Sequence, residues 1–523
     1  MTGIRLCVFL ILSSIFCSLK AQEINLKASR MKGEKRRGEN YQILNGNVMF
    51  EQAGSVVYCD EAEYNTAREE LTGRGNVRIS SSEGVVITGS SLFYNGKTKN
   101  ARVDGNVVLR DKGMTLTTPW ISYQTDSRIG YYGSGGRIVD GDQVLTSRTG
   151  SYNPNLRMLY FRHNVNISHP DYTVATDTLQ YSSESGTAWF FNYTEINLGD
   201  NTILCNYGRY NTKTGESHFT RNAAILSKEN IIRADTLDFD RNSGIGKAKG
   251  RLWVKDTSQN IIIFGQKGHY DRNRKYTLVE GKPLARKYEK NGDSLMLKAD
   301  TFIYHDDSIL KKRFLLAYSH VELWRQDFSG TADSLSYVAE DSLFRLFGKP
   351  VLWNANSRLN ADTMRMWLKN SRISLMQMRG KSFVATKEDQ TQFSQISGDN
   401  MDNRFDTENK LRSVWVRGHG QSVYFIREKD SVVSSANRVQ YNNMLIALDS
   451  GRVNEIRFYG QPEGIIYPID MLPGDKQKLP GFVWDEENRP KSERFTAPFS
   501  VPELPKRRTE NGEKPKTGKS KRK

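Results

Sequence analysis

Residues 234–256 read ADTLDFDRNSGIGKAKGRLWVKD, and they contain both halves of a pattern that recurs along most of this 523-residue chain. In the first half, Leu237 and Phe239 alternate with polar residues, which is typical of a strand with one buried face. The following DRNSG combines side chains that favour tight turns. The second half, GRLWVKD, alternates again. The stretch therefore predicts strand, turn and strand, without the 3.6-residue period of a helix.

An aromatic residue marks the first half of each repeat at a nearly constant spacing. Successive aromatics are separated by 30, 29, 29, 29, 29, 29 and 31 residues, at Tyr64, Tyr94, Tyr123, Tyr152, Tyr181, Tyr210, Phe239 and Tyr270. The series continues at Tyr304 and Tyr337, has Met366 in the same position, blurs near residues 403–405 and returns at Tyr441. About thirteen repeats therefore lie between residues 45 and 470.

A glycine-containing triplet opens the second half of each repeat. Examples are Gly46-Asn47-Val48, Gly75-Asn76-Val77, Gly105-Asn106-Val107, Gly250-Arg251-Leu252 and Gly380-Lys381-Ser382. The apolar residue after the glycine is expected to begin the second strand. One repeat cannot bury its own apolar face, so the repeats are expected to stack. Because short turns favour antiparallel pairing, the sequence predicts an all-β, elongated repeat β-jellyroll of about 26 strands in two-strand units of about 29 residues.

An aspartate recurs in the first half, at Asp235, Asp300, Asp333 and Asp362. Repetition favours a structural role over catalysis, and we expect each aspartate to begin a strand and to accept hydrogen bonds from turn amides. A Ca²⁺-binding ladder is the alternative, but the Gly-Gly-x-Gly-x-Asp pattern of such ladders is missing.

Motifs for catalysis, metal binding or a cofactor are not found in the sequence. The seven histidines lack zinc-ligand spacing, and His305-Asp306-Asp307 falls where the repeat predicts a turn. The glycine-rich residues 131–137 lack the context of a phosphate-binding loop, and there is no Gly-x-Ser-x-Gly motif. The sequence therefore predicts no enzyme, no metal site and no cofactor.

Two cysteines, Cys59 and Cys205, remain after the N-terminal segment and are predicted to be free thiols. Each lies five residues before a repeat aromatic, so they occupy equivalent positions five repeats apart. Stacking would separate them by at least about 24 Å, whereas a disulfide needs Cα atoms within about 7 Å.

The two ends of the chain differ from the repeats. Residues 1–21 resemble a secretory signal, with Arg5 before an apolar run and cleavage expected before Gln22; an uncleaved anchor is the alternative. Much of the net charge of +17 lies in the basic residues 506–523, which are expected to be disordered and either solvated or in contact with anionic lipid head groups. No stacking motif suggests nucleic-acid binding.

The sequence thus predicts a series of segments. They are a signal peptide (1–21), a lead segment (22–43), regular repeats (44–390), an irregular continuation (391–470), a cap or docking segment (471–500) and a basic tail (501–523).

The repeats resemble the OstA-like family of lipopolysaccharide-transport proteins, which includes the periplasmic bridge protein LptA and the N-terminal domain of LptD. The best matching stretches are residues 44–65, 71–95 and 234–256. The resemblance implies a V-shaped β-jellyroll in the periplasm whose apolar interior holds the acyl chains of lipid A. It also implies end-to-end strand docking with other lipopolysaccharide-transport proteins or with further copies of this chain. The chain is longer than a minimal bridge protein, and no family residue carries over as a catalytic one.

On this reading the interior wall binds lipid. The candidate residues are Val77, Tyr94, Val107, Leu179, Tyr181, Leu237 and Phe239. The alternatives are a structural or adhesive β-solenoid at the cell surface, and a polysaccharide-active β-helix enzyme, which would need clustered carboxylates. A transmembrane barrel is disfavoured because polar residues occupy the outer face of nearly every predicted strand.

Overall fold

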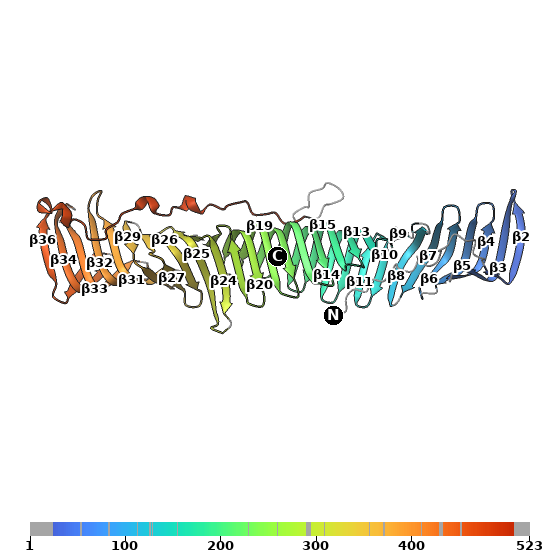
Figure 1. The fold of residues 1–523 in the computed structure, drawn as a ribbon, viewed down its shortest axis with the longest axis horizontal. Coiled ribbons are helices and arrows are strands. Elements are labelled where there is room, and N and C mark those ends of the chain that lie inside the picture. The colour runs from blue at the N-terminus through green and yellow to red at the C-terminus, as the bar shows by residue number, and fades with distance from the viewer. Residues whose placement is uncertain are drawn as a thin grey trace, which may run out of the picture. The chain divides into compact units, whose positions relative to one another are not determined.

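The computed structural model describes residues 25–52, 55–81, 84–111, 113–124, 127, 129–153, 155–228, 230–258, 260–288, 294–307, 309–354, 356–369, 372–408, 410–427, 432–449 and 452–506. These residues form 36 β-strands and four short 3-10 helices (Figure 1). The strand pairings described are antiparallel, for example β3 with β4 and β33 with β34. The chain is therefore all-β, as predicted. The predicted signal peptide and most of the basic tail lie outside the described residues.

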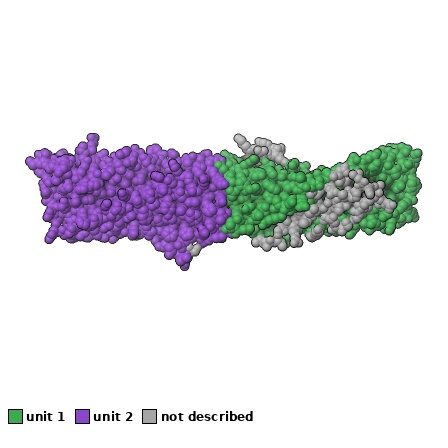
Figure 2. Space-filling view, in the orientation of Figure 1, with its two compact units in different colours: residues 1–228, 235–243, 503–523 green, residues 229–234, 244–502 purple. Residues whose placement is uncertain are grey.

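The chain divides into two compact units (Figure 2). Unit 1 comprises residues 1–228, 235–243 and 503–523, and unit 2 comprises residues 229–234 and 244–502. The strands of unit 1 are β1 (Asn25–Lys27), β2 (Arg30–Arg36), β3 (Glu39–Gln52), β4 (Ser55–Asn65), β5 (Glu70–Ser81), β6 (Val86–Asn95), β7 (Asn100–Asp111), β8 (Met114–Gln124), β9 (Ile129–Tyr132), β10 (Gly136–Asp140), β11 (Gln143–Ser147), β12 (Thr149–Asn153), β13 (Met158–His169), β14 (Tyr172–Ser182), β15 (Thr187–Leu198), β16 (Asn201–Asn211) and β17 (Glu216–Leu226).

Strand β18 (Asn230–Asp240) has residues in both units. Unit 2 contains β19 (Ile245–Asp256), β20 (Ile261–Asp271), β21 (Tyr276–Glu280), β22 (Leu284–Tyr288), β23 (Ser294–Lys298), β24 (Thr301–Asp307), β25 (Lys312–Arg325), β26 (Phe328–Val338), β27 (Leu343–Phe347), β28 (Val351–Asn354), β29 (Ser357–Asn360), β30 (Thr363–Lys369), β31 (Arg372–Lys387), β32 (Phe393–Phe405), β33 (Leu411–Arg427), β34 (Val433–Asp449), β35 (Arg452–Tyr459) and β36 (Glu463–Pro468). Its 3-10 helices are η1 (Ile469–Met471), η2 (Gly474–Lys476), η3 (Glu486–Asn488) and η4 (Ser492–Phe495).

In most pairings of long strands the register shifts near the middle because one of the two strands carries a bulge, and we call this place the corner. In the pairing of β13 with β14, Arg162 faces Thr178 and Val165 faces Thr176. Two residues of β13 therefore oppose the single residue Asp177 of β14. Both of them are left-handed, with φ of 62° and 55° at positions 163 and 164. A two-against-one bulge bends a strand, so the corner divides each strand into two arms.

The glycine triplets form these corners, which corrects the prediction that they begin a second strand. Gly75 and Asn76 have φ of 74° and 47° and lie inside β5, which begins at Glu70. Glycine and asparagine tolerate this conformation better than other residues. The bulge interrupts the apolar alternation within one strand, and the sequence therefore shows two alternating runs where the structure has one strand.

Some strands carry a repeat aromatic in one half. We call that half, and the half of a neighbouring strand that pairs with it, the aromatic arm, and we call the remaining half of each strand the opposite arm. In β5, residues 70–74 are the aromatic arm, because Leu71 pairs with Tyr94, and residues 77–81 are the opposite arm. Inner faces of both arms are apolar and buried, as at Leu92 and Val107. The longest helix among the described residues has four residues, so the arms have mainly one another to cover these faces. They meet tightly near the corner: a Cβ built on Gly89 would lie 2.5 Å from Cγ1 of Val103.

Thirty-six strands exceed the expected number of about 26 because several strands are interrupted at the corner. For example, β21 and β22 both pair with β20 and are separated by the segment Gly281-Lys282-Pro283. Proline has no N–H to donate to a sheet, so the ladder stops there. Other pairs of short strands, such as β27 with β28 and β29 with β30, are the two arms of a single bent strand.

The turns between strands follow the repeat aromatic, and an Asn or Asp closes them. The side chain of Asp240 accepts hydrogen bonds from the amides of Asn242 and Ser243 at 2.8 and 3.4 Å. Asn65 and Asn211 accept turn amides in the same way. These bonds and the bond from the Ser243 hydroxyl lower the pKa of Asp240. The prediction of a turn at DRNSG is confirmed.

Cys59 and Cys205 are both free and buried, as predicted. Burial raises the pKa of the Cys59 thiol to about 11 and that of Cys205 to about 12. Each is the residue immediately before a corner, where Ala234 stands in the opening stretch and is likewise buried. A small side chain fits this position because the two arms converge there.

Candidate functional site

The candidate lipid-binding residues all lie in unit 1, on the inner side of the arms. Val77 lies on the opposite arm of β5 and Val107 lies on the opposite arm of β7, and their side chains are 1% and 0% exposed. Leu179 and Tyr181 are buried on the aromatic arm of β14, and Leu237 is buried on β18.

Two of the predicted residues are less enclosed. Tyr94 of β6 and Phe239 of β18 are only half-buried. Tyr94 lies one residue before the strand end, and Phe239 has the same place on β18. Tyr181 has the same position on β14 but is 6% exposed, so the coverage of the repeat aromatic differs between strands.

The seven residues line one kind of surface at separate places and do not form a single cluster. On β14, Leu179 faces Phe161 and Tyr181 faces Leu159 of the neighbouring strand β13. These four side chains are all buried, and they form a continuous apolar patch on paired aromatic arms. The chemistry of such a wall is the exclusion of water from apolar groups.

The recurring aspartates lie near the corners. Asp235 and Asp333 are inside β18 and β26, which corrects their predicted position at strand starts, whereas Asp300 and Asp362 directly precede β24 and β30 as predicted. Asp60 accepts a hydrogen bond of 2.8 Å from the side chain of Asn76. In unit 2, Asp300 and Asp399 are 2.7 and 2.8 Å from Nδ1 of His320 and His419. These three aspartates each pair with a left-handed residue of the facing corner. This arrangement supports a structural role, and the turn-amide role belongs to the Asn or Asp after the repeat aromatic.

A segment of unit 2 that the sequence suggested as a cap lies on the outer face of the strands. Gly265 points inward, toward Val279, so the neighbouring Phe264 points to the side that this segment covers. Residues 469–502, which we call the strap, follow β36 and contain no strand. In Figure 1 the strap is the red ribbon that leaves β36 and runs back along the edge of the strands of unit 2. It contacts β34 near its start and β18 near its end.

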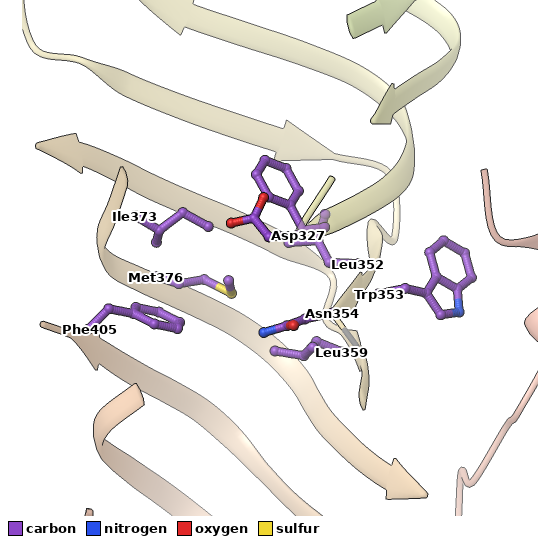
Figure 3. A pocket seen from close by; sticks show the side chains of 9 residues that line it. Asp327, Leu352, Trp353, Asn354, Leu359, Ile373, Met376 and Phe405 are labelled. Carbon is purple, nitrogen blue, oxygen red and sulfur yellow. The ribbon is translucent and has the colours of Figure 1, made fainter. Parts of the chain in front are cut away.

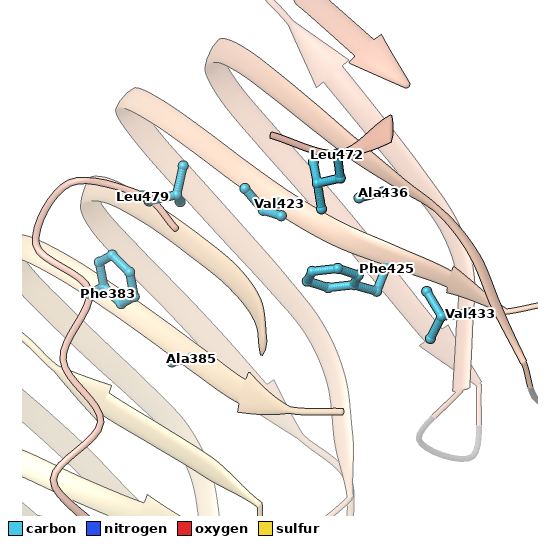
Figure 4. Close-up of a cluster of buried hydrophobic side chains, with 8 residues drawn as sticks. All are labelled: Phe383, Ala385, Val423, Phe425, Val433, Ala436, Leu472 and Leu479. Carbon is cyan, nitrogen blue, oxygen red and sulfur yellow. The ribbon is translucent and has the colours of Figure 1, made fainter. Parts of the chain in front are cut away.

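The first half of the strap completes an apolar cluster with β31, β33 and β34 (Figure 4). Leu472 and Leu479 of the strap are 8% and 3% exposed in this cluster. Phe482 and Trp484 pack against the same cluster. The ring centroid of Phe393 is 5.2 Å from that of Phe482 and 4.9 Å from that of Trp484. The buried strand residues are Phe383, Ala385, Val423, Phe425, Val433 and Ala436.

The second half of the strap contributes to another apolar cluster. Phe495, which is 1% exposed, packs with Trp253, Phe264 and Leu284 of β19, β20 and β22. The ring of Phe499 lies edge-on to Phe264, with 5.5 Å between centroids. Burial of a side chain such as Phe495 contributes on the order of 1.5–3 kcal/mol relative to leaving it exposed.

One buried amide binds the strap backbone from both sides. The side chain of Gln395 on β32 is 1% exposed. Its Nε2 donates to the carbonyl of Gln477 at 2.8 Å, and its Oε1 accepts the amide of Leu479 at 2.8 Å. These bonds satisfy polar groups that would otherwise be buried without partners.

Basic side chains from five strands bind acceptors on the strap, and we call them the basic row. Arg358 is nearly buried, and its Nε lies 2.5 Å from Oδ1 of Asp485. The other members donate to backbone carbonyls. They are Arg438 to Lys476 (2.9 Å), Lys298 to Arg494 (2.8 Å), Arg233 to Pro502 (2.9 Å) and Arg286 to Phe495.

A small cavity lies elsewhere in unit 2, between β26, β28, β29, β31 and β32 (Figure 3). Its volume is about 40 Å³, and it is lined by side chains such as Phe328, Trp353 and Met376. A space of this size has room for about one water molecule, so it cannot hold an acyl chain without movement of its walls.

The residues that the structure describes contain neither a metal-binding cluster nor a helix that could span a membrane. No group of three or more His, Cys, Asp or Glu side chains in that part of the chain is arranged to hold a metal ion. Among the same residues, no helix is long and apolar enough to cross a membrane.

Comparisons with known proteins agree with the repeat pattern. The family profile described as OstA-like protein matches residues 21–177 and 155–235. No curated protein matches the chain significantly.

Solved structures give distant similarities. A crystal structure of LptH from Pseudomonas aeruginosa, titled the LptA homologous periplasmic component of a lipopolysaccharide transport device, is 12% identical. The match covers 19% of this chain and 77% of that one, with a TM-score of 0.18. The WD40 domain of SCAP from fission yeast is 10% identical over 61% of this chain and 87% of that one, with a TM-score of 0.11. The sequence profile carries the likeness: residues 21–235 match the OstA-like family.

Proposed function

We propose that this protein binds lipopolysaccharide and acts, without catalysis, in lipopolysaccharide transport to the outer membrane. The match of residues 21–235 to the OstA-like family supports a role in this transport. The observation that carries the binding proposal is the repeated bent strand, whose two arms both present buried apolar inner faces. Acyl chains enter between the arms of unit 1, and each methylene that leaves water contributes about 0.8 kcal/mol.

The inner faces are closely packed, so lipid has to part the arms. The corners are suited to this movement because they interrupt the ladder with left-handed residues, as at Gly105 and Asn106. Gly89 and Val103 keep the corner itself closed, and the arms separate at their far ends. Half-buried residues there, such as Tyr94 and Phe239, are the first to meet an entering chain.

The proposed setting is the periplasm, reached through the signal segment 1–21. Other lipopolysaccharide-transport proteins, or further copies of this chain, dock at the end strands. Among the described pairings, β2 pairs only with β3 and β36 only with β34, so each presents unpaired backbone groups. Lipid A is the proposed ligand, and neither a cofactor nor nucleic acid is required.

Site-specific photo-crosslinking tests the proposal. A photoreactive amino acid replaces Val77, which points inward, or its neighbour Arg78, which is exposed on the other face of β5. The mature protein is incubated with purified lipopolysaccharide and irradiated. We expect adducts from position 77 and few from position 78. Equal labelling, or none at position 77 in a folded variant, would contradict lipid binding between the arms and favour an adhesive surface protein.

A further inference from the structure

The strap resembles an amphipathic lipid in the way it contacts the strands of unit 2. Its apolar side chains, such as Leu479 and Phe495, are buried among outward-pointing residues of the strands, on the face turned away from the interior between the arms. Its carbonyl oxygens and the carboxylate of Asp485 accept hydrogen bonds from the basic row. An acyl chain with an anionic head group would place the same two kinds of group in the same places.

The basic row is incompletely satisfied by the strap. The Nε atoms of Arg233 and Arg286 are buried and have no hydrogen-bond acceptor among the described residues. Burial lowers the pKa of Arg233, whose guanidinium also lies 4.8 Å from the ring centroid of Trp253. Each of these arginines binds a neutral carbonyl of the strap. A phosphate accepts two parallel bonds from a guanidinium and carries the opposite charge, so it matches these side chains better.

The strap is attached in a way that allows it to leave. Seven of the 14 prolines of the chain lie between residues 468 and 505. Proline cannot donate to a sheet, and the backbone–backbone hydrogen bonds recorded for the strap are local ones, such as Phe482 to Leu479. The strap is held to the strands by side chains, so its release breaks no strand ladder.

We propose that unit 2 contains a second site for an anionic, acyl-chain-bearing lipid, and that the strap occupies this site until lipid displaces it. This inference rests on the proposed function of the chain as a lipopolysaccharide-binding protein. The apolar clusters take the acyl chains and the basic row takes the phosphates. Because the strap is part of the same chain, its effective concentration at the site is about millimolar, and lipid has to compete against it.

Two photo-crosslinking positions separate this inference from the proposed function. One reporter replaces Val77 in unit 1. The other replaces Ile262 of β20, a half-buried residue packed against the cluster around Phe495. Each is placed in the full mature chain, in a strap-release variant carrying Leu479→Asp and Phe495→Asp, and in a control carrying Met471→Asp. Met471 lies on the strap but is 69% exposed.

Strap release is expected to raise lipopolysaccharide adducts at position 262 about tenfold, because a site that is open only about a tenth of the time loses that factor in apparent affinity. The yield of adducts at position 77 should not change. The Met471→Asp control should give the same adduct yields at both positions as the chain with the unmodified strap. Adducts at position 77 together with an unchanged yield at position 262 would overturn the strap inference alone. Absence of adducts at both positions would overturn the proposed function.

Hydrogen exchange on the unmodified chain provides a test that needs no variant. Addition of lipopolysaccharide should speed the exchange of amides in residues 469–502, for example that of Leu479, which Gln395 holds at 2.8 Å. Vesicles of a neutral phospholipid serve as the comparison and should have little effect. Unchanged exchange at a lipid concentration that labels position 77 would contradict displacement of the strap.

Discussion

The two units share the bent strand but differ in how the outer face of the strands is covered. In unit 1, outward residues such as Tyr58 and Arg78 are exposed to solvent. In unit 2, outward residues such as Trp253 and Phe383 are large and are buried against the strap. The comparison shows that the same repeat pattern supports either a solvated outer face or an apolar outer face covered by an additional segment.

The difference follows from the size and charge of the outward residues, which in unit 2 include large apolar side chains such as Phe264. Basic side chains beside them, such as Arg286 and Arg438, donate hydrogen bonds to carbonyls of the strap. The strap supplies acceptors to them and apolar groups to the aromatic residues beside them. Its contribution to unit 2 can be tested by substitutions matched with ones in unit 1.

The largest effect is expected from Phe495→Ala. Removal of this 1% exposed ring from the cluster with Trp253 and Phe264 should cost about 3–5 kcal/mol locally. Hydrogen exchange of the amides of β20 and β22 measures this loss, and unit 1 amides should keep their protection. The control, Met471→Ala, removes an exposed strap side chain and should change little. Unchanged protection of β20 in Phe495→Ala would show that unit 2 closes without the strap.

Asp485→Asn is expected to have the next largest effect. It removes the charge that pairs with the nearly buried Arg358, at a cost of about 2–3 kcal/mol; the partial exposure of Asp485 keeps this below the value for a fully buried pair. Urea unfolding of unit 2 would report the loss. Glu408→Gln, which breaks an exposed pair with Lys410, is the control and should cost less than about 1 kcal/mol. Equal costs for the two variants would contradict a buried role for Arg358.

Gly89→Ala should destabilise unit 1 by about 1–3 kcal/mol, because the new Cβ would clash with Val103 where the arms meet. Gly265→Ala in unit 2 should cost a similar amount, since its Cβ would lie 2.4 Å from Val279. Gly33→Ala has open space around it and serves as the control. Thermal unfolding measures all three. A large difference between Gly89→Ala and Gly265→Ala would show that the corners of the two units are not equivalent.

The smallest effect concerns an exposed ion pair of unit 2. Hydrogen bonds from the backbone and side chain of Arg313 lower the pKa of Glu340 from its usual 4.5 to about 2. The ionised form therefore stabilises the fold above pH 4.5, and this contribution is lost as the pH falls toward 2. Because both side chains are partly exposed, it should stay below about 1 kcal/mol. The difference in unfolding free energy between Glu340→Gln and the unmodified chain should shrink between pH 6 and pH 2 and at high salt, and a constant difference would contradict the assignment.

The sequence alone determined the period, the strand-rich class and many of the inward residues of the strands. Leu179, Tyr181 and Leu237 were predicted from alternation and are buried, because the period of two in a strand is a local property of the backbone. The free cysteines were also predicted, since equivalent positions in different repeats cannot come together. Tyr94 and Phe239 were placed correctly in the pattern, but how much of each ring is covered depends on the facing arm.

Only the tertiary structure decided the corners and the strap. The left-handed conformation of Gly75 and Asn76 looks like an ordinary turn signal in sequence, and only the pairing with the strand that carries Asp60 shows a bulge inside a strand. The strap has no period of its own, so nothing local predicts that Phe495 contacts Trp253, more than 200 residues earlier. Contacts of that kind arise from the shape of the assembled wall, and local sequence patterns carry no information about them.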